Sequence, residues 1–308
     1  MNCVYRINLK TGGSEKNKVR DKLIDFCLHN PQKQFLAIGW YYVYEKDFLS
    51  EQASYSDYYY AVKKYEKRIN PVHNIFWNTK EGTLFWTRDL SGFYWICRAK
   101  GAAETYLSKE LDIGAVIPVE AYCYGLEVPG QIKASFNRPR AGTAEIIRDP
   151  NILEFSKYVF NQCANRTEYV LESTLHNNII ENLPDLELEE LIIAYLQIEL
   201  GYYVLSNSIA NKSTTIKVEC ELMSRDVSNP QKAVVQVKAG NQINLCASEY
   251  KEFADNGYNV YLYCPHFIED YKSDKIVHIT KDTIMKFYNK HKLILPDSIT
   301  KWESLFTI

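Results

Sequence analysis

The sequence lacks the features that mark membrane-spanning, secreted and zinc-stabilised proteins. No run of 18 apolar residues occurs in the 308-residue chain, and its first six residues lack the apolar core of a signal peptide. The eight cysteines are scattered, with no Cys-x-x-Cys pair and no Cys/His cluster at zinc spacing. No internal repeat or low-complexity tract is present. These absences predict a folded, cytoplasmic protein in which most cysteines are small buried hydrophobes.

A strong charge of one sign is also missing. The chain carries 36 Lys/Arg and 38 Asp/Glu, a net charge of −2, which disfavours binding of nucleic acid by bulk attraction alone. The average conceals a split. Residues 1–145 carry 20 basic and 16 acidic side chains, or +4, which leaves 16 against 22, or −6, for the remainder. The N-terminal half is therefore the expected partner of a polyanion.

The first half of the chain has mainly β patterning. Apolar residues at helical spacing predict two helices, and β-branched and aromatic runs around a turn at residues 89–92 predict a hairpin. A further strand is expected directly after Pro129-Gly130. We predict a mainly-β, barrel-like domain over residues 1–147, with helices at 17–29 and 56–69 and strands at 35–40, 83–88, 93–98 and 116–123.

The second half alternates helices with a central run of strands, which predicts an α/β sandwich over residues 148–308. Its expected helices cover 150–163, 187–199, 245–255 and a polar tail from 281, and its expected strands cover 203–206, 214–223, 232–238 and 258–263.

One short strand in this half carries polar residues in an apolar setting. Gln236 and Lys238 are two residues apart, so they point to the same face of the sheet, and the preceding strand brings Glu219 and Glu221. A hairpin would place a Glu219 carboxylate, a Gln236 carbonyl and a main-chain carbonyl where they ligate Mg²⁺ or Mn²⁺ through oxygen. Lys238 would then lie beside the metal-bound water. The register leaves Glu219 and Glu221 as alternative metal acids.

Glu190 begins an otherwise apolar helix that ends at Gly201 and runs directly into a strand, so its carboxylate would form the far wall of the same pocket. This helix, the acid on the next strand and Gln236-x-Lys238 together resemble the PD-(D/E)xK superfamily of restriction-endonuclease-like nucleases. The likeness is to its Mrr-type Q-x-K variant, over residues 150–265.

The resemblance implies a restriction-endonuclease-like fold and a metal-dependent endonuclease of the modification-dependent or antiviral defence type, which acts on DNA rather than RNA. It implies Glu219 as the metal-binding acid, Gln236 as the substituted second ligand, Glu190 as an accessory acid and Lys238 as the catalytic lysine. A homodimer is expected, because one metal site cuts one strand.

Aromatic residues are dense in the first half, and successive residues of a strand point to opposite faces, so one face cannot bury them all. We expect some of them to stack on bases or to line a cage for a modified base. The predicted nucleic-acid contacts are the aromatic residues Trp40, Trp86 and Trp95 and the basic residues Lys133, Arg138 and Arg140.

Other interpretations remain open at this point. A Gln-x-Lys pair on a strand is commonly a solvated edge, and glutamates there pair with lysines across strands. The chain would then be a catalytically inactive, nuclease-like protein that binds nucleic acid or recruits a partner. A third possibility is a nuclease gated by a nucleotide or a protein, with the aromatic half as the receptor.

Overall fold

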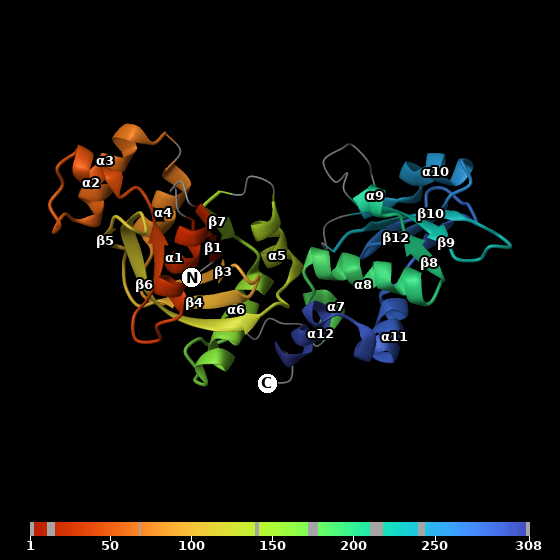
Figure 1. Ribbon diagram of the computed structural model, residues 1–308. Helices are drawn as coiled ribbons and strands as arrows, with labels where there is room; N and C mark the ends of the chain where they lie inside the picture. The colour runs from red at the N-terminus through yellow and green to blue at the C-terminus, as the bar shows by residue number, and fades with distance from the viewer. Residues whose placement is uncertain are drawn as a thin grey trace. The chain divides into compact units, whose positions relative to one another are not determined.

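The computed structural model describes residues 3–10, 16–67, 69–138, 142–171, 178–209, 218–239 and 244–305. Internal contacts divide the chain into two compact units, Met1–Ser173 and Thr174–Ile308. Both units mix helices and strands, which confirms the predicted mixed α/β class (Figure 1). The first unit is not mainly β as predicted, because the helices from α1 (Lys16–Leu28) to α6 (Pro150–Ala164) accompany its strands. Within the described ranges, no helix is both long enough and apolar enough to cross a membrane.

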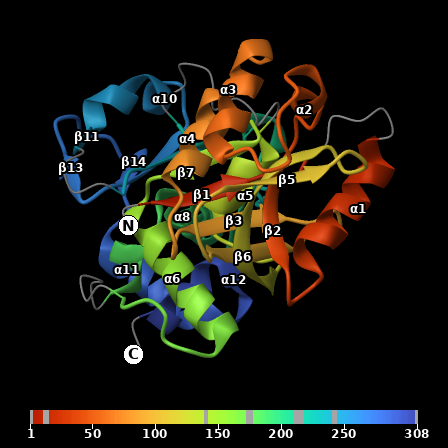
Figure 2. The same ribbon diagram turned by 90° about the vertical axis from the view of Figure 1, so that its left-hand side faces the viewer.

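The first unit is built on a seven-stranded sheet that curls into a half-barrel (Figure 2). The strand order is β2-β6-β4-β3-β1-β7, and β5 pairs with β6. β1 runs parallel to β3, and the other described pairs are antiparallel. The strands are β1 (Val4–Ile7), β2 (Gln34–Ile38), β3 (Leu84–Arg88), β4 (Tyr94–Ala99), β5 (Glu104–Ser108), β6 (Ile113–Gly125) and β7 (Ala144–Ile147).

The predicted hairpin is confirmed as β3 and β4. Asp89 closes the turn between them, because its carboxylate accepts the main-chain N–H of Phe93 at 2.9 Å. Gly92 has a φ of 90°, a left-handed conformation that glycine adopts without steric cost.

Helices cover both faces of this sheet. Apolar side chains of the first, third and fourth helices pack with one face in a common core. The sixth helix packs on the other face, where Phe155 contacts Trp86. The helices are α1 (Lys16–Leu28), α2 (Tyr42–Lys46), α3 (Tyr55–Tyr65), α4 (Asn70–Asn78), α5 (Gly130–Asn137) and α6 (Pro150–Ala164).

Two predictions for this region are wrong. The segment after Pro129-Gly130 is the helix α5 rather than a strand, because Ile132, Ser135 and Phe136 recur at helical spacing and bury one face. The boundary near residue 147 is also too early. The helix α6 lies in the first unit, where the Trp86 indole donates to the Ser156 hydroxyl at 2.9 Å in the core.

The second unit is built on a five-stranded sheet of order β14-β12-β10-β9-β8 and a separate pair, β11 and β13. β10 is antiparallel to β9 and parallel to β12. The strands are β8 (Tyr202–Val204), β9 (Cys220–Ser224), β10 (Lys232–Val237), β11 (Asn244–Cys246), β12 (Asn259–Tyr263), β13 (His266–Ile268) and β14 (Ile276–His278).

Helices lie on both faces of the five-stranded sheet, with α10 on one side and α8 and α11 on the other (Figure 1). The predicted helix 245–255 begins instead with the strand β11, and residues 214–217 of the predicted strand 214–223 lie outside the described residues. The helices are α7 (Ile179–Asn182), α8 (Asp185–Ile198), α9 (Ser206–Ile209), α10 (Lys251–Asp255), α11 (Lys281–His291) and α12 (Asp297–Thr300), with 3₁₀ turns η1 (Ala247–Tyr250), η2 (Lys292–Ile294) and η3 (Lys301–Leu305).

Candidate functional site

Three of the predicted site residues meet where β9 begins and β10 ends, and we call Glu219, Gln236 and Lys238 the strand-end trio. The ladder pairs Val235 with Cys220, and the N–H of the preceding Glu219 donates to the carbonyl of the same Val235 at 2.8 Å. Glu219 therefore lies at the end of the ladder, within reach of Gln236. Since side chains alternate along a strand, Lys238 lies on the same face as Gln236.

The strand-end trio is held by short polar contacts. The Gln236 amide Nε2 donates to Glu219 Oε1 at 2.5 Å and to the Val237 carbonyl at 3.1 Å. The Lys238 ammonium lies 3.9 Å from the same Glu219 oxygen. Gln236 is 4% exposed, whereas the Glu219 and Lys238 side chains are 13% and 40% exposed, so the trio runs from a buried amide to an open ammonium.

The structure distinguishes the two acids that the sequence leaves open. Glu221 pairs with Val234 in the ladder, and its N–H donates to the Ser208 hydroxyl at 2.9 Å. The carboxylate in contact with Gln236 and Lys238 is that of Glu219. These side-chain contacts select Glu219 as the acid of this site.

Glu190 does not join the strand-end trio in the described contacts, which corrects the expectation that it walls the pocket. It is exposed on α8, because the buried side of this helix carries Leu188, Leu191 and Ile192. The trio lies on the sheet face that carries Val234, which packs with the Tyr250 side of the unit, whereas α8 covers the opposite face (Figure 1).

Two polar residues near these elements are missed by the sequence motif. Glu187, in the first turn of α8, is 2% exposed and lies on the buried side that Glu190 avoids. A negative charge there is favoured by the helix dipole. Tyr250 packs in the core on the trio's sheet face, and burial and the charges of Glu249 and Glu219 raise its pKa, so its hydroxyl stays protonated. Helical spacing would have marked Glu187 as buried, but no motif marks Tyr250.

The donor set suits a hard cation that keeps most of its water. Within the described ranges, no group of three or more His, Cys, Asp or Glu side chains is placed to hold a metal. The trio supplies one carboxylate and, after rotation of its amide, the oxygen of Gln236. Mg²⁺ is commonly bound by one or two carboxylates together with waters and a substrate phosphate, so these residues fit Mg²⁺ better than a fully protein-ligated ion.

The tryptophans predicted to contact nucleic acid occupy mainly structural positions. Trp86 is fully buried, so the prediction for it is wrong: its ring fills the core against α6. Trp40 is half-buried against the first unit's core and has a φ of 66°, an unusual conformation for a residue with a side chain. Trp95 is half-buried, and its indole donates to Asp89 at 3.0 Å.

The predicted basic contacts are partly neutralised. Lys133 pairs with Glu127 at 2.8 Å, and Arg138 pairs with Glu145 at 2.9 Å. Arg138 is nevertheless 61% exposed and remains open on one side. Arg140 lies outside the described residues.

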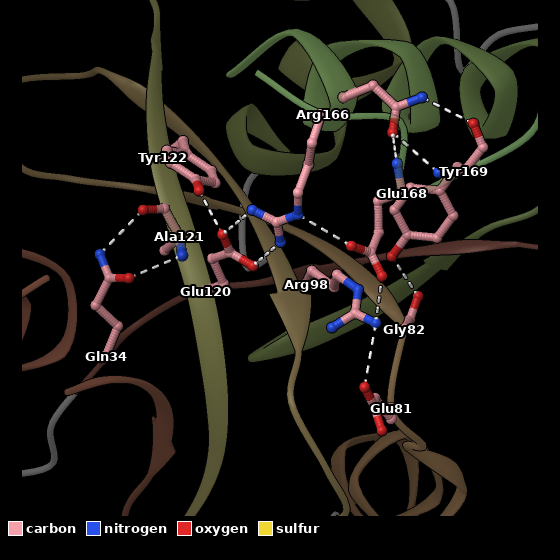
Figure 3. A network of polar contacts seen from close by, with 11 residues as sticks. Gln34, Glu81, Gly82, Arg98, Glu120, Ala121, Tyr122, Arg166, Glu168 and Tyr169 are labelled. Atoms are coloured by element: carbon pink, nitrogen blue, oxygen red, sulfur yellow. Dashed lines mark hydrogen bonds and ion pairs between the residues drawn. The ribbon is translucent and has the colours of Figure 1, made fainter. Parts of the chain in front are cut away.

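A dense polar network holds the end of α6 to the sheet (Figure 3). We call Glu81, Arg98, Glu120, Arg166 and Glu168 the arginine–glutamate network. Arg166 is bidentate to Glu120, at 2.8 and 2.5 Å, and contacts Glu168 at 3.1 Å. Arg98 lies between Glu168 at 2.7 Å and Glu81 at 3.3 Å. Each arginine of this network has carboxylate partners, so the network stabilises the fold.

Comparison of the chain with protein-family models, with curated proteins and with solved structures gives no match.

Proposed function

We propose that this protein is a metal-dependent endonuclease that hydrolyses phosphodiester bonds, with DNA as its substrate. The observation that carries the proposal is the strand-end trio, in which a nearly buried amide, a carboxylate and an ammonium meet on one sheet face. The residue types agree with the PD-(D/E)xK resemblance of the sequence.

Each member of the trio has a role that its position supports. Glu219 and the Gln236 amide oxygen would hold Mg²⁺ or Mn²⁺, and such an ion acts as a Lewis acid on a phosphoryl oxygen. The 40% exposed Lys238 ammonium reaches solvent beside Glu219, where it would orient the attacking water and offset the charge that develops on the phosphate. Glu219 would keep Lys238 in place through their 3.9 Å ion pair.

The wider proposal assigns recognition to the first unit and cleavage to the second. The excess of basic residues in the first 145 positions supports nucleic-acid recognition there. A restriction-endonuclease-like fold, a defence role against foreign or modified DNA and a homodimer that cuts both strands belong to the same proposal and follow from the resemblance.

The test is cleavage of DNA by purified variants. Wild type, Lys238→Ala and Glu219→Gln are incubated with modified DNA, unmodified DNA and RNA in Mg²⁺ and in Mn²⁺, and the products are separated by gel. Loss of one transition-state contact lowers the rate about a hundredfold or more. We therefore expect both variants to lose cleavage and to keep the thermal stability and DNA binding of the wild type.

Lys232→Ala provides a matched control, because Lys232 lies on the same strand but is exposed at its far end. It should cut like the wild type. Cleavage by Lys238→Ala at the wild-type rate would refute the proposed role of the trio.

A second candidate function is an inactive, nuclease-like protein that binds nucleic acid. It is favoured by the donor set, since the trio offers one carboxylate and the described residues contain no larger cluster of acidic or imidazole ligands. Tight DNA binding without cleavage in either metal would establish this alternative. Cleavage that requires an added nucleotide or protein would instead indicate a gated nuclease.

A further inference from the structure

Four arginines gather in the first unit around the carboxyl ends of β1 and β3, and we call Arg6, Arg20, Arg88 and Arg138 the cationic cluster. β1 and β3 are parallel neighbours, so their carboxyl ends lie at the same edge of the sheet. Arg6 comes from β1 and Arg88 ends β3. Arg20 comes from α1, and Arg138 follows α5.

Shared partners bring these arginines together. The guanidinium carbons of Arg6 and Arg88 lie 5.6 and 5.4 Å from the centre of the Phe136 ring. Arg6 and Arg138 each donate to one oxygen of Glu145 at 2.9 Å. One aromatic ring and one carboxylate thus hold three cations.

Arg20 reaches the same edge from α1. Its Nε donates to the carbonyl of Leu9 at 2.9 Å, two residues beyond the end of β1. Lys10 follows Leu9 and adds a further basic residue beside Arg20. The cluster therefore receives side chains from two strands, one helix and the residue that follows α5, and Lys10 in the loop after β1 lies at its edge.

Among the described residues, the carboxylate that pairs with these arginines is Glu145, which contacts Arg6 and Arg138. The acids next in sequence keep their charge but face other groups: Asp89 accepts from Trp95, and Asp149 caps α6. The described ion pairs of the cluster therefore set one carboxylate against four guanidiniums.

Several donors of the cluster also remain available. Arg6 is 1% exposed, and within the described residues its Nε has no hydrogen-bond partner. The described bonds of Arg20 use Nε, and those of Arg88 use Nη1, which donates to Asn137 at 2.7 Å. Terminal nitrogens of the half-buried Arg20 and Arg88 are thus left for a ligand.

The titration behaviour agrees with this geometry. Burial lowers the pKa of Arg6, and the charge of Arg138 acts in the same direction. Burial and the charge of Arg88 lower the pKa of Arg20, while burial and the charges of Arg6 and Arg20 lower that of Lys10. An anion among these groups would offset the mutual repulsion of the cations.

We propose that the cationic cluster binds a phosphate group, carried either by a nucleic-acid backbone or by a free nucleotide. Guanidiniums match phosphate oxygens with pairs of parallel donors, and they keep their charge at every physiological pH. The rigid sheet edge holds Arg6 and Arg88 in place, and the half-buried Arg20 and Arg88 present their ends to solvent. This inference stands whether or not the second unit cuts DNA.

The experiment compares the double variant Arg20→Gln/Arg88→Gln with the control Lys22→Gln/Lys109→Gln. Both lose two positive charges from the first unit, and Lys22 lies on the same helix as Arg20 but pairs with Glu110 in solvent. Binding of fluorescein-labelled DNA duplex and single strand is measured by anisotropy, and binding of ATP by calorimetry, with inorganic phosphate as competitor.

We expect the double variant to bind its ligand about tenfold or more weakly than the wild type, because it loses charged hydrogen bonds to phosphate. The control should stay within about twofold of the wild type. Weakened DNA binding with no affinity for ATP identifies a nucleic-acid backbone as the source. Saturable ATP binding that the double variant loses identifies a free nucleotide.

Equal affinity of the double variant and the control for DNA, ATP and phosphate would overturn the inference. A second readout does not depend on affinity for a large ligand: low millimolar phosphate should raise the Tm of the wild type and of the control, but not that of the double variant. Lys238→Ala should bind like the wild type. Cluster-dependent binding without cleavage by any protein would refute the nuclease and leave the phosphate site intact.

Discussion

The first unit holds two groups of arginines, and the fold treats them differently. In the arginine–glutamate network two cations face three carboxylates, and the contacts tie the end of α6 to the sheet (Figure 3). In the cationic cluster four arginines have one carboxylate among the described contacts, Glu145, which pairs with Arg6 and Arg138. A cation matched by carboxylates stabilises the fold, whereas a cation held among other cations is poised for an anion from outside. The cost of removing a positive charge should therefore be larger in the arginine–glutamate network than in the cationic cluster.

The largest effect should come from breaking the arginine–glutamate network. Arg98→Met leaves Glu168 without one partner in a place where Arg98 is 14% exposed, so we expect it to lower the free energy of unfolding by about 2 kcal/mol. Arg88→Met, in the cationic cluster, should cost less than about 1 kcal/mol, because relief of repulsion offsets its lost bond to Asn137. Urea unfolding gives both values. Equal losses in the two variants would remove the distinction between the groups.

Local patterns predicted most of the elements that position these groups. The β3–β4 hairpin was expected because aromatic and β-branched runs flank a turn that ends in glycine. The helix α5 was missed because Pro129-Gly130 suggested a turn before a strand. In the structure, Pro129 is the N-cap residue at which α5 begins. Neither arginine group could be predicted, because its contacts join residues that lie far apart in the chain, such as Arg166 and Glu120 or Arg6 and Glu145.

For the strand-end trio too, contacts within neighbouring strands could be predicted from the sequence, whereas the packing of a distant helix could not be predicted from the motif. Glu219, Gln236 and Lys238 were expected together because alternation along two hairpin strands fixes which side chains share a face. Glu190 was expected with them, yet its exposure depends on which side of α8 packs on the sheet. The spacing of Leu188, Leu191 and Ile192 contains that information, whereas motif order alone does not.

A smaller loss of stability should appear when the pH is lowered and the glutamates of the arginine–glutamate network become protonated. Hydrogen bonds from Arg166 hold the pKa of Glu120 below its ordinary value of 4.5, and the Tyr122 hydroxyl acts in the same direction. The stabilisation is therefore fully present above about pH 4.5 and is lost as the pH falls through the lower pKa of the folded state. Between pH 5 and pH 3, we expect the free energy of unfolding to fall by about 1 kcal/mol more in the wild type than in Glu120→Gln. The difference is small because the Glu120–Arg166 ion pair is partly exposed to solvent.

Thermal or urea unfolding across this pH range measures the difference between the two proteins. Glutamine at position 120 keeps the size of the side chain and an acceptor for Arg166 but cannot titrate. The variant therefore separates the effect of the charge from that of the side-chain shape. Parallel acid profiles of wild type and Glu120→Gln would mean that the Arg166 pair contributes nothing to stability.

The smallest expected effect is a gain in stability, on mutation of Lys10 at the edge of the cationic cluster. Burial and the charges of Arg6 and Arg20 lower the pKa of Lys10, so the charged form of Lys10 is less favoured in the folded protein than in the unfolded chain. Lys10→Gln should therefore raise the free energy of unfolding by about 0.5 kcal/mol at low salt. The gain should vanish at about 1 M salt, where charges are screened within about 3 Å. Lys22→Gln should show no such gain, because Glu110 raises the pKa of Lys22 and so favours its charged form. Destabilisation by Lys10→Gln at low salt would mean that the positive charge of this region is already balanced inside the protein, and the contrast between the two arginine groups would disappear.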